Sequence, residues 1–159
     1  MNVSLLLIEL KKIGAEIAEI EGREVSYWTA AFPVPDGADY GFIAYIYADG
    51  NSDISANLRE SSSGEWFWFA AFEVVGYSSI HEAHTHFLET LVLLLDNPTR
   101  IVQKKGWLNM YFTCEYMTAG EWHYAGGGAT LRFTNFRFPK IDGKLREYRS
   151  TSVRDCMTD

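Results

Sequence analysis

The chain has 159 residues, of which 47% are apolar and 22% are charged, a composition typical of one globular domain with a substantial core. Its formal net charge is −7. Residues 1–95 carry 14 acidic and 4 basic side chains, whereas residues 96–159 carry 7 acidic and 10 basic ones. Because an acidic surface repels phosphate backbones, this balance argues against general nucleic-acid binding. The first residues lack the basic start and cleavage site of a secretory signal, so we expect a cytoplasmic protein with reduced cysteines.

The first third of the chain predicts a helix followed by strands. Apolar residues recur at helical spacing over residues 2–20. A strand is predicted at 25–32, before the turn-rich segment 33–39. Residues 40–48 and 51–59 then predict a β-hairpin around Asp49-Gly50, a dipeptide typical of two-residue primed turns.

This hairpin has a predicted register. A two-residue turn places Tyr45 opposite Ile54 and directs both side chains toward the helices. The serine-rich turn 61–64 leads into a further strand at 65–73, in which Phe67 is expected to lie opposite Leu58.

The most apolar stretch, residues 80–95, predicts the central helix. At 100° per residue its apolar side chains fall on one broad face, which holds Ile80, Ala83, His84, Phe87, Leu88, Leu91, Leu94 and Leu95. Ser78 or Ser79 can cap its start, and Asn97-Pro98 ends it, because the residue before a proline is pushed out of the α region. The stretch is too short, and too interrupted by His and Glu, to cross a membrane.

Strands are predicted again in the last third of the chain, at 99–105, 107–117, 121–125 and 129–138, with the last two separated by the glycine run 126–128. We expect 99–105 to be an edge strand guarded by its lysines. The polar, basic stretch 139–159 is expected to be a C-terminal tail outside a single domain of residues 1–138.

Together these elements predict an α+β fold in the order α-β-β-β-β-α-β-β-β. We expect one mostly antiparallel sheet with helices 2–20 and 79–96 packed on one face.

Metal and catalytic motifs are incomplete. His84 and His86 point in different directions on a regular helix, and the second histidine of an HExxH zinc motif is missing because position 85 is threonine. We therefore expect no metal and no cofactor at His81, His84 and His86. Cys114 lies in the middle of a predicted strand, and we interpret it as an inert core residue rather than as a nucleophile paired with His123.

The sheet face opposite the predicted helices is aromatic, where an antiparallel sheet usually shows polar residues. Aromatic and arginine side chains dominate protein interfaces because they bury large areas at a small entropic loss. The candidate protein-binding residues are Phe42, Asn57, Arg59, Trp66, Trp68, Phe72, Trp107, Tyr111 and Glu115. The sequence leaves open that the C-terminal segment or a second layer covers these rings.

These features favour a small non-enzymatic protein-binding module, of the same type as bacterial immunity proteins and other inhibitors that neutralise a basic partner such as a toxin. The alternative is a ligand-binding or enzymatic domain, with an apolar pocket between helix 79–96 and the sheet in which His84, Tyr45 and Tyr116 supply polar groups. The order of elements and the acidity are also similar to those of bacterial secretion chaperones, although the tryptophan-rich strands and the lack of a shared motif depart from that family. A homodimer is left open.

Overall fold

The computed structural model describes residues 2–22, 26–59, 66–73, 77–105, 109–131 and 146–154. The helices and strands follow in the order α1 (Val3–Lys12), β1 (Glu16–Ile20), β2 (Tyr27–Ala31), β3 (Tyr40–Tyr47), β4 (Ser52–Arg59), β5 (Trp66–Glu73), α2 (Ile80–Asp96), β6 (Thr99–Lys105), β7 (Asn109–Thr118), β8 (Glu121–Leu131) and β9 (Arg146–Ser150). The predicted α+β class with antiparallel strands is confirmed.

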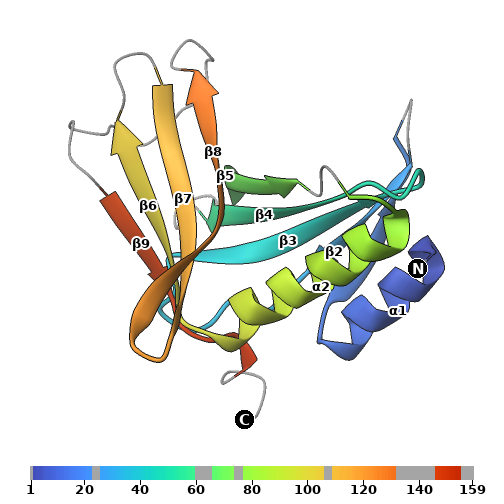
Figure 1. Cartoon of the computed structure of the whole chain (residues 1–159), viewed down its shortest axis with the longest axis horizontal. Helices are drawn as coiled ribbons and strands as arrows, with labels where there is room; N and C mark the ends of the chain where they lie inside the picture. The colour runs from blue at the N-terminus through green and yellow to red at the C-terminus, as the bar shows by residue number, and fades with distance from the viewer. Residues whose placement is uncertain are drawn as a thin grey trace.

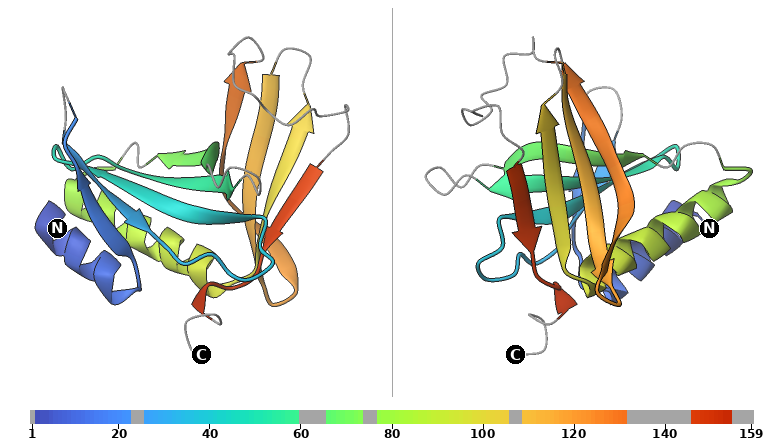
Figure 2. Two further views of the ribbon diagram at one scale, coloured as in Figure 1. Left: turned by 180° about the vertical axis from the view of Figure 1, so that it is seen from behind. Right: turned by 60° about the vertical axis from the view of Figure 1, so that its left-hand side comes forward.

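The strands form two antiparallel sheets instead of the single sheet that we expected. The five-stranded sheet has the order β1-β2-β3-β4-β5, and the four-stranded sheet has the order β8-β7-β6-β9. Both helices lie on one face of the five-stranded sheet, as predicted (Figure 1). The four-stranded sheet stands upright at one end of the first, so that the molecule has an L-shaped profile (Figure 2). The face of the five-stranded sheet turned away from the helices lies inside the L.

Helix α1 is shorter than the predicted helix 2–20. The side chain of Asn2 caps its start by accepting a hydrogen bond from the Leu5 amide, at 2.9 Å. The helix ends at Lys12 because Gly14 takes a φ of 94°, a conformation that glycine adopts readily. The chain then reverses into β1, and the apolar spacing that we interpreted as one helix belongs to a helix and a strand.

Helix α2 matches its prediction closely. The hydroxyl of Ser79 accepts a hydrogen bond from the Glu82 amide at 3.2 Å, and Glu82 accepts one in return from the Ser78 hydroxyl. The helix ends at Asp96, just before Asn97-Pro98. Its buried side chains are Ala83, His84, Phe87, Leu91, Leu94 and Leu95.

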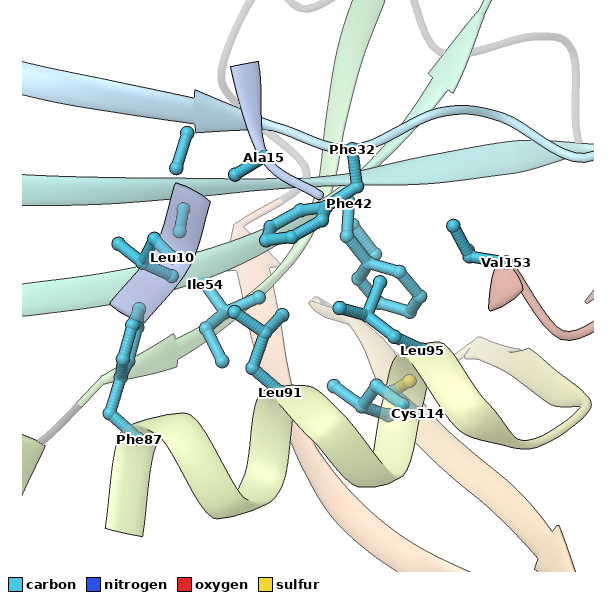
Figure 3. Packing of buried hydrophobic residues seen from close by; sticks show 14 of the residues in the cluster. Leu10, Ala15, Phe32, Phe42, Ile54, Phe87, Leu91, Leu95, Cys114 and Val153 are labelled. Carbon is cyan, nitrogen blue, oxygen red and sulfur yellow. The ribbon is translucent and has the colours of Figure 1, made fainter. Parts of the chain in front are cut away.

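The core lies between the helices, the five-stranded sheet and the base of the four-stranded sheet. Phe87 and Leu91 of α2 point toward the sheet, where Phe42 and Ile54 meet them (Figure 3). Cys114 of β7 belongs to the same cluster and is fully buried. Each large apolar side chain buried here contributes roughly 1.5–3 kcal/mol before the loss of chain entropy is subtracted.

The β3–β4 hairpin turns through three residues, not two. The Tyr47 amide donates to the Asn51 carbonyl at 2.9 Å, and the Gly50 amide donates to the Tyr47 carbonyl at 3.0 Å, which leaves residues 48–50 as the loop. Gly50 has the positive φ that we predicted, 90°, but in a longer turn in which glycine takes the left-handed position.

The extra loop residue moves the register by one. Tyr45 pairs with Asp53 rather than with Ile54, and Phe42 pairs with Ala56. Because successive strand residues point to opposite faces, the β3 side chains are exchanged between the two faces relative to the prediction. The β4 side chains Ile54 and Ala56 face the core as expected.

Part of the expected tail is built into the fold. Residues Arg146–Ser150 form β9, which pairs with β6, so the predicted boundary at residue 138 does not separate this strand from the domain. Strand β6 is consequently an inner strand instead of an edge strand. Beyond β9, the Val153 amide donates to the Leu95 carbonyl at 2.8 Å, which ties the chain to the end of α2.

The glycine run 126–128 lies inside strand β8 rather than interrupting it. A side chain at Gly127 would overlap the carbonyl oxygen of Phe112 on β7, so the close approach of these two backbones requires glycine. Neither helix in the described part of the chain is long and apolar enough to span a membrane.

Candidate functional site

The face of the five-stranded sheet turned away from α1 and α2 is the candidate functional site. On β3, Phe42, Ala44 and Ile46 are buried against the helices, so Tyr45 and Tyr47 alternate onto the other side. We call this side the open face. From β1 to residue 57 of β4 its side chains are Glu16, Ala18, Ile20, Tyr27, Thr29, Ala31, Ile43, Tyr45, Tyr47, Asp53, Ser55 and Asn57.

Burial on the open face decreases steadily from β4 to β1. Ser55 and Asn57 on β4 are buried, with exposed fractions of 1% and 3%. The β3 and β2 side chains are half-buried, and the β1 side chain Ile20 is 38% exposed. The half of the open face over β1 to β3 is thus accessible, and no other described element lies on it (Figure 2).

Three tyrosines cluster in the accessible half. Tyr27 on β2 lies directly opposite Tyr47 on β3, with ring centroids 5.7 Å apart and planes inclined by 42°. Tyr45 is its diagonal neighbour, at 6.1 Å and 47°. Partial burial, and then the neighbouring phenols Tyr27 and Tyr47, raise the pKa of the Tyr45 hydroxyl above its ordinary value. We call these three residues the tyrosine cluster.

The tyrosine cluster borders acidic side chains. Asp53 on β4 lies directly opposite Tyr45. Partial burial raises the pKa of Tyr47, and the charges of Asp53 and, more weakly, Asp49 raise it further, which means that both carboxylates act on this phenol. The residues of the open face over β1 to β3 include no lysine or arginine. The accessible half is therefore both aromatic and negatively charged.

Two predicted site residues, Phe42 and Asn57, are not on the accessible surface. Phe42 is 2% exposed and belongs to the core, because the register shift turned it inward. The backbone of Phe72 on β5 pairs with that of Ile54 on β4. Asn57 does take an open-face position, but it is buried, and its side-chain amide donates to the Ser55 carbonyl at 3.4 Å.

Two of the predicted tryptophans lie on β5, where the backbone of Trp66 pairs with that of Arg59 and the backbone of Trp68 pairs with that of Asn57. A bulge between Ala56 and Asn57 shifts the pairing here. Trp107 lies outside the described residues.

Tyr111 and Glu115 lie on a different surface. They belong to β7, on the face of the four-stranded sheet that points away from Cys114. Tyr111 is 46% exposed. Glu115 accepts hydrogen bonds from Arg100, whose Nε is 2.7 Å away, and the guanidinium of Arg100 lies 4.1 Å from the centroid of the Trp122 ring. Tyr111 and Glu115 are therefore separated from the candidate residues of the five-stranded sheet, because β7 belongs to the other sheet.

The alternative pocket does not assemble. His84 is fully buried under the β3–β4 turn, where its Nε2 lies 2.9 Å from the Gly50 carbonyl. Tyr45 is on the far side of the sheet, and Tyr116 stacks on His123 in the four-stranded sheet, with centroids 5.5 Å apart. The three polar groups thus occupy three separate places. A shallow groove beside the β3–β4 turn is lined by residues 2–4, 48–50 and Ile80, and His84 is not among its lining residues.

The remaining candidates for metal binding or catalysis are the histidines of α2 and Cys114 of β7. His86 lies against Tyr77, with its Nδ1 2.6 Å from the phenol oxygen. Among the described residues no group of three or more His, Cys, Asp or Glu side chains converges as a metal site would require. Burial raises the pKa of the Cys114 thiol, which opposes formation of the reactive thiolate.

Sequence reasoning missed Tyr27 and Tyr47 and assigned Tyr45 to the opposite face. The missing signal was the length of the hairpin loop, since a three-residue loop would have directed Tyr45 and Tyr47 outward. The chain matches no family model, no curated protein and no solved structure.

Proposed function

We propose that this protein is a non-enzymatic binding module that holds a basic protein partner on the open face of its five-stranded sheet. The observation that carries the proposal is the tyrosine cluster beside Asp53, on a half-buried sheet face that the described residues leave accessible. Tyrosine joins a large apolar ring to a polar hydroxyl and is enriched where proteins bind each other.

Charge supports the choice of partner. The half of the chain that builds the five-stranded sheet carries most of the acidic side chains and few basic ones. A complementary positive partner would be attracted to this half and would associate faster, and wrong partners with the same sign would be repelled. An inhibitor that neutralises a basic protein such as a toxin fits this distribution.

The accessible aromatic face also distinguishes this proposal from an enzymatic one. An active site requires polar groups that converge on one reacting atom. His84, Tyr45 and Tyr116 lie apart, whereas Tyr27, Tyr45 and Tyr47 form a continuous contact surface.

Site-specific crosslinking tests the proposal. A photoreactive benzoylphenylalanine would replace Ala18, which is exposed on the open face, and in a second variant Glu89, which is exposed on α2. After irradiation in living cells that encode the chain, crosslinked proteins are identified by mass spectrometry. We expect a protein of net positive charge to be crosslinked from position 18 and not from position 89.

The control is the same crosslinking with Tyr47→Ala added. Loss of the position-18 product together with retained folding, checked by circular dichroism, supports binding through the tyrosine cluster. Identical products from positions 18 and 89, or products that persist after Tyr47→Ala, would exclude the open face as the binding surface.

A further inference from the structure

The tyrosine cluster has a chemistry more specific than that of a general apolar patch. Its rings are inclined by 42° and 47° rather than stacked face to face, so each keeps part of its π-face uncovered. The π-face of an aromatic ring carries partial negative charge and attracts cations. The carboxylate of Asp53, directly across from Tyr45, adds a full negative charge at the edge of the cluster.

We infer that the tyrosine cluster is a subsite for the guanidinium group of an arginine side chain. The inference rests on the proposed function in one respect, namely that the arginine belongs to the bound protein. The planar guanidinium would lie against the Tyr27 and Tyr47 rings and turn its N–H donors toward Asp53. Ile20, which pairs with Tyr27 and is 38% exposed, offers an apolar contact for the aliphatic part of the side chain.

The same chain already contains this combination of groups within its own fold. On the four-stranded sheet, the guanidinium of Arg100 lies 4.1 Å from the centroid of the Trp122 ring, while its Nη2 is 2.6 Å from a carboxylate oxygen of Glu115. A ring and a carboxylate from neighbouring strands thus hold one arginine. The open face presents a ring cluster and a carboxylate in a similar cross-strand arrangement.

Arginine fits this subsite better than lysine. A guanidinium is flat, stacks on aromatic faces and is more weakly hydrated than an ammonium group. It also has several N–H donors in one plane, so that it can contact the rings and the carboxylate at the same time. We therefore expect an order of affinity in which arginine exceeds lysine and lysine exceeds any neutral side chain.

The probe is a short acetylated and amidated peptide of alternating glycine and arginine, compared with peptides in which lysine or citrulline replaces arginine. Citrulline has nearly the shape of arginine but no charge. Binding is followed by NMR of protein with ¹³C-labelled tyrosine rings. We expect the arginine peptide to shift the signals of Tyr27, Tyr45 and Tyr47, and to leave those of Tyr111 and Tyr124 unchanged.

Variants define the contributions of the ring and of the carboxylate. Tyr27→Leu should weaken binding of the arginine peptide roughly two- to fivefold, the range of an exposed cation–π contact, while Tyr27→Phe should retain most of it. Asp53→Asn should weaken binding by a comparable factor of about two to five. Tyr124→Leu is the matched control, because Tyr124 is 67% exposed on the other sheet, and it should have no effect.

Two results would overturn the inference. One is a citrulline peptide that shifts the same three rings as strongly as the arginine peptide. The other is an arginine peptide that shifts Tyr111 and Tyr124 as much as the tyrosine cluster. Both comparisons use the unaltered protein, so they do not depend on the stability of any variant. A failure here with successful crosslinking from position 18 would reject the arginine subsite and leave the proposed function standing.

Discussion

The hydroxyl of Tyr40 on β3 donates a 2.5 Å hydrogen bond to Oγ1 of Thr99, the first residue of β6. Tyr40 belongs to the five-stranded sheet and Thr99 to the four-stranded sheet, and the two side chains are 0% and 1% exposed. This bond therefore joins the two arms of the L inside the core. It helps to fix the angle at which the four-stranded sheet meets the end of the open face.

Tyr40→Phe should destabilise the protein by roughly 1–3 kcal/mol, because it removes the donor and leaves the Thr99 hydroxyl buried without this partner. The free energy of unfolding in urea measures the effect. Tyr111→Phe, which alters an exposed tyrosine, is the control and should change stability by less than about 0.5 kcal/mol. Equal effects of the two changes would contradict the role of the bond between the sheets.

Alkaline pH should destabilise the protein through Cys114 and Tyr40. Burial raises the pKa of both groups above their ordinary values of 9.0 and 10.0, so each stays protonated in the folded chain after it has ionised in the unfolded one. The resulting stabilisation is complete below about pH 9 and decreases as the pH rises further. The free energy of unfolding in urea is measured across this pH range. In Cys114→Ala its decrease should begin at a higher pH, and in Tyr40→Phe it should be less steep above about pH 10. If both variants lost stability with pH as the wild type does, the alkaline destabilisation would not arise from Cys114 and Tyr40.

Gly50→Ala should destabilise the protein by more than Gly37→Ala does. Both glycines have a positive φ, at 90° and 75°, which costs alanine about 1 kcal/mol. A side chain at Gly50 would in addition overlap Ile80, whereas the space beside Gly37 is open. In a Gly50→Ala background that also carries Ile80→Ala, the destabilisation from the overlap should disappear, and only that from the positive φ should remain. Urea unfolding of the single and double variants measures both contributions. Equal costs at the two glycines would argue against the packing of the β3–β4 turn on α2.

Phe42→Ala and Tyr45→Ala test the corrected faces of β3. Phe42 is buried against the helices, so its truncation should cost roughly 3–5 kcal/mol. Tyr45 lies half-buried on the open face, and its truncation should cost about 1 kcal/mol. Thermal melts compare the two directly. The reverse order would restore the two-residue turn and the register that we first predicted.

The sequence predicted elements that have strong local signals. Helix α2 has an apolar stripe, a serine cap and a terminating Asn97-Pro98, and these three agree on its position. The β4 face and the pairing of Leu58 with Phe67 were also predicted correctly. Such features depend on side chains that are near each other along the chain.

The errors arose where a small difference has a large spatial effect. One more residue in the β3–β4 loop exchanged the faces of Phe42 and Tyr45, since strand side chains alternate with a period of two. The division into two sheets depends on long-range pairing, such as that of β9 with β6, which no local pattern reveals. For this reason Glu115 and Asn57, predicted on one surface, lie in different sheets.

The dissociation constant of the crosslinked partner tests the central claim, that the open face is the binding surface. With the partner purified, calorimetry would compare the wild type with Tyr47→Ala and with Tyr124→Ala, an exposed tyrosine on the other sheet. We predict that Tyr47→Ala weakens binding about 30-fold, as for a ring buried at the centre of an interface. Tyr124→Ala should change the constant by less than about twofold, within the range of a change outside the interface. Unchanged affinity in Tyr47→Ala, or a larger loss in Tyr124→Ala, would contradict the account.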